Sequence, residues 1–160
     1  MAEKYPLSLF LVVCNPRADL VIKNLPNVYK QWGVDNLTDV DITLAKILRK
    51  LDSSQAVPRR ACIEIVSDVL LQHHAVATRK WLSALIQDLK SKGFTILAVI
   101  DTLVSPEEIP PVSELFDGEI QITEKETAAG IKKALKILKL YKQQYAEVEL
   151  PLTEKELQSQ

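Results

Sequence analysis

Three short, nearly uninterrupted apolar runs constrain the fold of this chain more than any other feature of its sequence. They lie at residues 7–14 (LSLFLVVC), 61–66 (ACIEIV) and 94–100 (FTILAVI). Runs of this length that contain β-branched side chains are typical of strands buried on both faces of a parallel sheet. Because segments with helical periodicity separate them, we predict an α/β fold of three layers, with a largely parallel sheet flanked by helices.

Two helices are expected from apolar residues that recur every three or four positions. The first spans about residues 39–52, where Thr38 and Asp41 have the spacing of a capping box. The second follows the strand at 61–66 and ends at Gly93. Shorter predicted elements are a helix at 17–25, one helical turn after Ser105, and a strand at 119–123.

The last third of the chain leaves two interpretations open. Residues 128–145 fit a helical face in part and an alternating strand in part, whereas residues 147–160 are polar and indicate a loosely held tail. A chain of 160 residues buries enough surface for one core. We therefore expect a single domain at 1–146, followed by the tail.

The net charge, the lack of long apolar runs and the positions of the cysteines indicate which partners and which cellular location to expect. The formal net charge is −1, so nucleic acid is an unexpected partner. No apolar run approaches the ~20 residues that a membrane span needs, and the polar first residues are unlike a signal peptide. Cys14 and Cys62 lie inside apolar runs, which predicts buried thiols. Together these features predict a cytoplasmic protein without membrane contact.

The scarcity of glycine excludes several chemistries. The chain has four glycines, and none lies in a GxGxxG or GxxxxGK[ST] motif. Such loops need glycine so that backbone N–H groups approach phosphates closely.

CxxC, HExxH and GxSxG motifs are also missing from the sequence. Adjacent His73 and His74 would point about 100° apart on a helix, so they indicate polar residues at a helix start or loop rather than a metal site.

Carboxylates near the ends of the apolar runs are the candidate functional residues. Glu64 lies inside a predicted buried strand, where a charge is costly unless it faces a ligand or metal or pairs with a base such as Arg59 or Arg60. Asp68 fits a helix cap better than a ligand. Asp101 follows a strand and is either a ligand-side residue or a turn residue. The lysines between residues 125 and 142 fit a solvated mixed-charge face or, alternatively, a strip that contacts phosphate or a partner.

The order of these segments resembles that of the RecA-like ATPases, specifically the archaeal KaiC-like group. The resemblance is clearest over residues 60–123, where RACIEIVSDVL aligns without a gap and places Glu64 at the Walker B acid. RKWLSALIQDLKSKG, FTILAVI and LFDGEIQI resemble the helix, strand and Asp-Gly turn that follow. LKILKLYK resembles the closing strand, with Lys139 kept but Tyr141 in place of the arginine. The resemblance implies C-terminal antiparallel strands, one of them over about 134–141.

Several parts of that family's active site have no counterpart here. The first strand, the P-loop and its helix are missing, and Cys14 and Asn15 stand where active members have glutamates that activate water. Phosphoryl transfer depends on phosphate positioning, Mg²⁺ and water orientation. The resemblance therefore implies no catalytic residue and no bound metal or cofactor. It leaves relics of a nucleotide and metal site, namely Glu64, Ser67, Asp68 and Lys139.

We thus expect a degenerate or truncated RecA/KaiC-like domain that is non-catalytic and has a structural or regulatory role through protein contacts. The alternative is that the chain is the C-terminal portion of an ATPase whose P-loop lies upstream, in which case ATP and Mg²⁺ would be its cofactors. A third hypothesis is a binding module for a small anionic ligand near Asn15, Ser67 and Asp101. Unpaired strand edges and the family's habit of self-association imply a homo-oligomer, with another protein partner possible.

Overall fold

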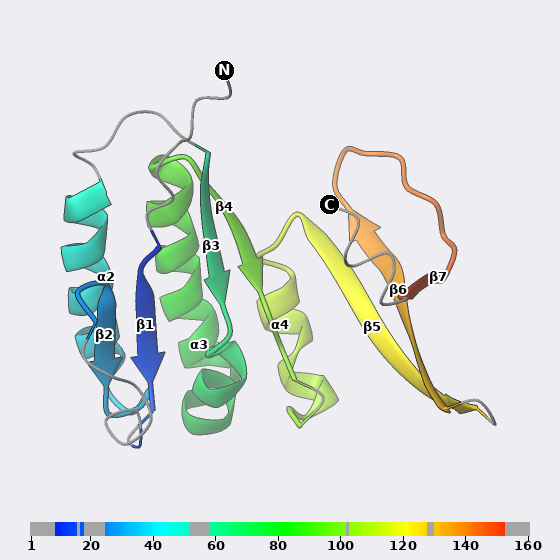
Figure 1. Cartoon of the computed structure of the whole chain (residues 1–160), viewed down its shortest axis with the longest axis horizontal. Helices are drawn as coiled ribbons and strands as arrows, with labels where there is room; N and C mark the ends of the chain where they lie inside the picture. Colours follow the sequence, from blue (N-terminus) through cyan, green and yellow to red (C-terminus); the bar gives the residue numbers. More distant parts are fainter. Residues whose placement is uncertain are drawn as a thin grey trace. The chain divides into compact units, whose positions relative to one another are not determined.

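Strands and helices alternate along the first part of the chain (Figure 1). The computed structural model describes residues 9–15, 17, 25–51, 58–101, 103–127 and 130–152. The chain divides into two compact units, Met1–Val112 and Ser113–Gln160. This division does not coincide with the boundary expected after residue 146, and the single domain at 1–146 stays a prediction.

The N-terminal unit contains two parallel strand pairs. Strand β1 (Leu11–Cys14) pairs with β2 (Val28–Gln31), and β3 (Arg59–Ile63) pairs with β4 (Phe94–Ala98). Parallel partners need a crossover connection, and α3 (Val66–Ser91) supplies it between β3 and β4. The α/β class and the parallel pairing are therefore confirmed. The predicted helix at 17–25 lies largely outside the described residues, and β2 was not predicted.

Three further helical segments belong to this part of the chain. They are α2 (Leu37–Leu51), the 3₁₀ turn η1 (Pro106–Glu108) and the short α4 (Pro110–Ser113). The capping box predicted for α2 is wrong, because Asn36 precedes the helix and its Oδ1 accepts the Thr38 backbone N–H at 3.1 Å. Among the described residues, no helix has the length and apolarity to cross a membrane.

The described helices cover one face of the strands, behind them in Figure 1. Helix α3 packs on β4 and buries Val66, Val69 and Leu82. Burial alternates along β3 and β4, and Leu97 keeps 58% of its surface exposed on the other face. The prediction of strands buried on both faces is therefore wrong. The second helical layer of the three-layer arrangement is not found among the residues described.

The C-terminal unit is an antiparallel sheet. Strands β5 (Gly118–Thr127) and β6 (Gly130–Leu140) form a long hairpin, and β7 (Leu150–Leu152) pairs with the other edge of β6. The strand implied over about 134–141 is confirmed, and the helical interpretation of residues 128–145 is wrong. The expectation of a loose tail is also wrong for Leu150–Leu152, because their backbone joins the sheet.

Candidate functional site

The carboxyl ends of β1, β3 and β4 point to the same end of the N-terminal unit, the lower end in Figure 1. Open parallel sheets bind ligands at this end. Asn15 follows β1, Glu64 follows β3, and Asp101 comes three residues after β4. These candidates therefore lie at the same end of the unit, although β1 belongs to one strand pair and β3 and β4 to another, and their contacts decide what they can do there.

Ser67 and Asp101 are joined by a hydrogen bond. The backbone N–H of Asp101 donates to Ser67 Oγ at 2.7 Å, so the start of α3 holds the loop that follows β4. Asp101 Oδ1 in turn accepts the backbone N–H of Leu103 at 3.1 Å. A carboxylate that accepts the N–H two residues later is a turn-forming group. Of the two interpretations of Asp101, the structure therefore supports the turn residue.

Glu64 is not a buried strand residue. Strand β3 ends at Ile63, and the Glu64 side chain is exposed to solvent. Arg59, one proposed partner, donates instead to the carbonyl oxygens of Leu51 (3.1 Å) and Lys92 (3.3 Å). The desolvation cost that made Glu64 a conspicuous candidate is therefore absent, because water solvates its carboxylate.

Asp68 does not cap α3, and its negative charge contributes to the pKa of Cys14. It lies in the first turn of α3, where the helix dipole favours an acidic group, but Ile65 occupies the N-cap and no side chain caps the helix there. Burial, and to a lesser degree the negative charge of Asp68, raise the pKa of Cys14. Cys14 is half-buried and Cys62 is exposed, both as free thiols, so the prediction of a buried Cys62 is wrong.

Lys139 lies in the C-terminal unit, on β6. Its Nζ donates to the carbonyl oxygen of Phe116 at 2.8 Å, which secures the segment that enters β5. Other lysines of the hairpin pair with carboxylates: Lys133 with Glu124 at 2.7 Å and Lys125 with Glu149 at 3.0 Å. These contacts support the solvated mixed-charge face over a phosphate-binding strip.

These residues do not fit Mg²⁺ and ATP. A magnesium site needs converging oxygen ligands, yet the described part of the chain has no group of three His, Cys, Asp or Glu side chains placed to hold a metal ion. Ser67 Oγ already accepts the Asp101 N–H. We therefore derive no catalytic step for this edge of the sheet.

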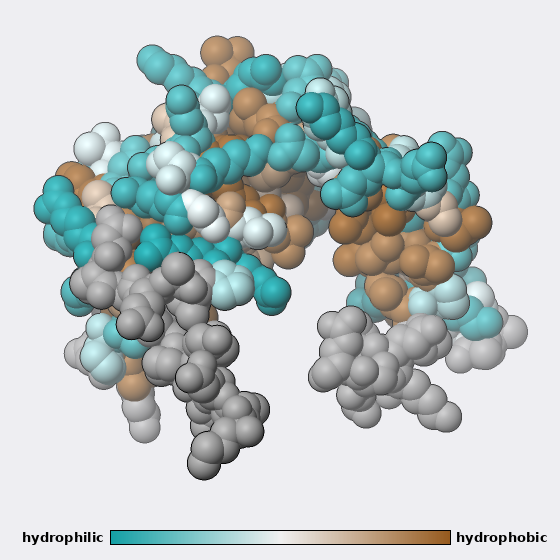
Figure 2. All heavy atoms as spheres, turned by 90° about the horizontal axis from the view of Figure 1, so that it is seen from above, coloured by the Kyte–Doolittle hydropathy of each residue, from teal (hydrophilic) through white to brown (hydrophobic). Residues whose placement is uncertain are grey.

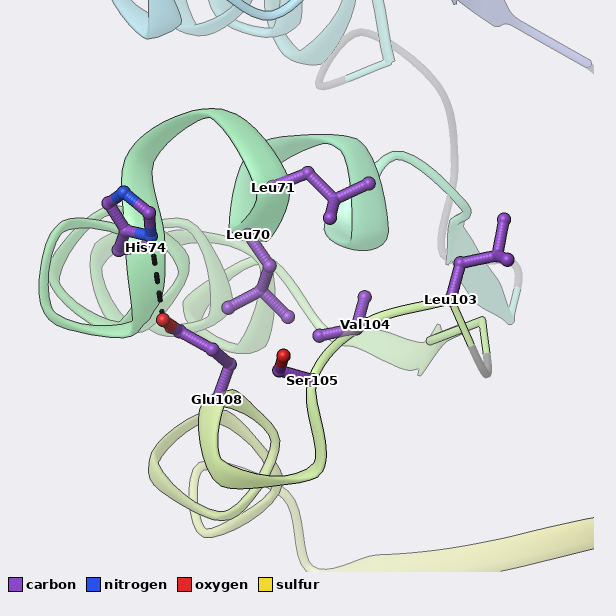
Figure 3. A pocket seen from close by; sticks show the side chains of 7 residues that line it. All are labelled: Leu70, Leu71, His74, Leu103, Val104, Ser105 and Glu108. Carbon is purple, nitrogen blue, oxygen red and sulfur yellow. Dashed lines mark ion pairs between the residues drawn. The ribbon is translucent and has the colours of Figure 1, made fainter.

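A small cavity that sequence reasoning missed lies beside a break in α3 (Figure 3). His74 adopts φ 59° and ψ 172°, which interrupts the helix between the stretches 66–73 and 75–91. Glu108 Oε2 accepts the backbone N–H of Ala75, and Glu108 Oε1 lies 3.4 Å from His74 Nδ1. His73 Nε2 donates to the Val34 carbonyl at 2.7 Å. Glu108 therefore works as the N-cap of the second helical stretch.

The cavity is too small for a typical ligand. Its volume is about 190 Å³, and that of a second groove between α2 and α3 is about 170 Å³, against the ~300–1,000 Å³ common for ligand sites. The contacts of Glu108 are those of a helix cap, so the site holds two segments together. The lining residues of the first cavity are Leu70, Leu71, His74, Leu103, Val104, Ser105 and Glu108.

Parallel strand pairs with a helical crossover, followed by an antiparallel sheet, define an α/β fold. Among solved structures, the fold is similar to that of the KaiC-like protein PH0186 from the hyperthermophilic archaeon Pyrococcus horikoshii OT3, with a TM-score of 0.55. Sequence identity is 21%, over 79% of this chain and 58% of that chain. The similarity shows the fold alone, and this chain spans less than two thirds of that structure. No family profile and no curated protein matches the sequence.

Proposed function

We propose that this chain is a RecA-like domain that does not hydrolyse ATP and acts through protein contacts. The observation that carries the proposal is the open face of β3 and β4. Cys62 and Leu97 are register partners on this face, both are exposed, and Val99 beyond the end of β4 is exposed as well. When apolar side chains gather on one exposed face, that face more often contacts another molecule than remains covered by water alone.

The chemistry at the neighbouring edge of the sheet supports the same proposal. A phosphate cradle requires a glycine-rich loop, which the sequence does not contain. Glu64 is solvated, and Asp101 forms a turn. What the N-terminal unit offers a partner is therefore apolar surface rather than a charged pocket.

Nucleotide titration tests the proposal. We expect no heat of Mg-ATP binding at micromolar protein and no phosphate release above the buffer background, because the sequence has no glycine-rich loop to cradle the triphosphate. A melting curve without nucleotide establishes that the sample is folded. Micromolar binding, or turnover that Glu64→Gln abolishes, would show that the chain is an ATP-binding enzyme.

A second candidate function is ATP hydrolysis by a longer protein whose carboxyl-terminal part is this chain. It is supported by the share of the KaiC-like structure that this chain spans, 58%. Sequencing the reading frame upstream of Met1 decides between the two: a GxxxxGK[ST] motif in frame favours the second candidate. The longer protein would then be assayed in place of this chain.

A further inference from the structure

Two strongly exposed leucines lie beside the small cavity at the break of α3. Leu71 keeps 57% and Leu103 keeps 78% of its surface exposed, and both line the cavity. Its inner wall is apolar as well, because Leu70 and Val104 are buried there. In Figure 3, Leu103 lies on the side of the cavity away from Glu108. The cavity is therefore an apolar hollow with an exposed apolar rim.

Exposed apolar side chains also gather on the sheet of the C-terminal unit (Figure 2). There Ile122 shares its face with Glu124 and Lys133, which form an ion pair at 2.7 Å. That face is interrupted by charges that already neutralise each other. The cavity beside α3 is therefore the better candidate for binding an apolar group from outside the chain.

The cavity has the size of one side chain. Its volume is about 190 Å³, and a protein cavity of ~150 Å³ is large enough to bind benzene. A phenyl ring or a leucine side chain therefore fits, although a typical whole ligand does not. Contacts between proteins commonly depend on a few apolar or aromatic side chains that each fill a pocket of the partner.

The two stretches of chain that build the cavity are acidic. Residues 61–78 and 93–112 contain five carboxylates and no lysine or arginine. The carboxylates are those of Glu64, Asp68, Asp101, Glu107 and Glu108. Arg79, which follows the first stretch, donates to the carbonyl oxygen of Pro111, and Arg17 follows β1 in the other strand pair. A cationic partner is therefore attracted to this part of the unit.

Glu108 brings one of these carboxylates to the cavity wall. Its Oε2 accepts the Ala75 backbone N–H, and its Oε1 lies 3.4 Å from His74 Nδ1. A carboxylate has about four lone-pair positions, so Glu108 can accept a further donor. The φ of 59° and ψ of 172° at His74 belong to a region that is nearly reserved for glycine. Strained residues of this kind are concentrated at ligand clamps and switches.

We propose that this cavity anchors one apolar side chain of a partner protein, from a segment that also carries a lysine or arginine. The inference rests on the proposed function and names the chemistry of one of its protein partners. The apolar side chain fills the space between Leu71 and Leu103, and the cation lies beside Glu108. The same negative surface disfavours the triphosphate of ATP.

Capped dipeptides test the site on the wild-type chain. In a nuclear magnetic resonance titration, acetyl-phenylalanyl-arginine amide should shift the signals of Leu71, Leu103 and Glu108. Its dissociation constant should be on the order of 1 mM, because one anchored side chain gives little affinity. Exchanging the arginine for glutamate should weaken binding at least about threefold, and exchanging the phenylalanine for glycine should abolish the shifts. Added salt should weaken binding of the arginine peptide.

A pair of matched variants locates the binding. Leu103→Ala removes apolar surface from the rim and should weaken binding of the arginine peptide by roughly threefold or more. The control is Leu9→Ala, the same substitution at a leucine that is 70% exposed but lies before β1. It should bind the peptide as the wild type does. Because both leucines are exposed, both variants should keep the melting temperature of the wild type.

Several results would overturn the proposal. One is the absence of shifts at the cavity with several millimolar arginine peptide, and another is equal binding of the arginine and glutamate peptides. Equal binding by the wild type and Leu103→Ala would do the same. Shifts at the cavity when the wild type is concentrated without peptide would assign the site to a second copy instead. None of these titrations contains ATP, so failure of this inference and failure of the proposed function are distinguishable.

Discussion

Two carboxylates show how the surroundings of a residue decide its role. The family resemblance places Glu64 at the Walker B acid, yet its side chain is solvated and lies beyond the end of β3. Glu108 belongs to a segment that the sequence marks only as a short turn, yet it caps a helical stretch more than thirty residues earlier in the chain. Spacing along the chain identifies local caps, but it carries no information about a cap supplied from a distant segment.

Replacing Glu64 by glutamine should leave stability unchanged. Because the carboxylate is exposed and no described residue pairs with it, its loss removes neither an ion pair nor a desolvation cost. We expect the free energy of unfolding in urea to change by less than ~0.5 kcal/mol. A loss of several kcal/mol would instead reveal a buried ion pair at this position.

Glu108→Ala should destabilise the chain. The substitution removes the acceptor of the Ala75 N–H and the partner of His74, and loss of an N-cap costs ~1 kcal/mol. The ion pair adds little, since His74 is 78% exposed. The adjacent, exposed Glu107→Ala is the control and should change the unfolding midpoint little. Equal effects of the two substitutions would contradict the capping role.

At the scale of elements, hydrophobic periodicity predicted the main strands and helices but not their ends. The run at 94–100 became β4, yet the strand stops at Ala98. Strand β2 was not predicted because its sequence, VYKQ, is short and half polar. It is defined by its pairing with β1, which a local pattern does not contain. The hairpin strand β6 was assigned through the family resemblance, since the spacing of its apolar residues fits helix and strand alike.

The break inside α3 could not be read from the sequence either. Residues 66–91 carry apolar side chains at helical spacing on both sides of His74, and no proline or glycine marks the interruption. Tertiary contacts impose it: Val34 binds His73, while Glu108 binds Ala75 and His74. A positive φ at a non-glycine residue is costly unless its surroundings fix it, and these contacts do so.

Substituting glycine at the break tests this account of α3. His74→Gly should stabilise the chain by about 1 kcal/mol, because glycine adopts φ 59° without the ~1–3 kcal/mol strain of other residues but loses more backbone entropy. Gln72→Gly, two residues earlier in regular helix, should cost ~1 kcal/mol. Thermal melting of the two variants measures both effects. If His74→Gly is as destabilising as Gln72→Gly, α3 is continuous in solution.

At the scale of the whole molecule, both units leave large apolar side chains exposed on a sheet. In the N-terminal unit these include Leu97 on β4, and in the C-terminal unit Ile120 and Ile122 on β5, which share their face with Glu124. The sequence predicted buried strands and self-association, but it could not show that the described helices would cover only one side. The sequence of an apolar strand is the same whether the second face of that strand packs against a helix of its own chain or against a partner.

The open face of the N-terminal unit should be detectable with a dye that fluoresces on folded apolar surface. Dilute wild-type protein should bind the dye while keeping its near-ultraviolet circular dichroism, which separates an open native face from a loosened core. Leu97→Glu should weaken the fluorescence, because Leu97 lies at the centre of that face and is 58% exposed. Its free energy of unfolding should change by no more than ~0.5 kcal/mol.

The control for this experiment is Thr95→Glu, which adds the same charge to the same strand and face at an exposed polar position. It should leave most of the dye signal intact, because it removes little apolar surface. Equal fluorescence from the wild type and Leu97→Glu would mean that the face of β3 and β4 is covered in solution. In that case the protein contacts that we propose would have to use another surface.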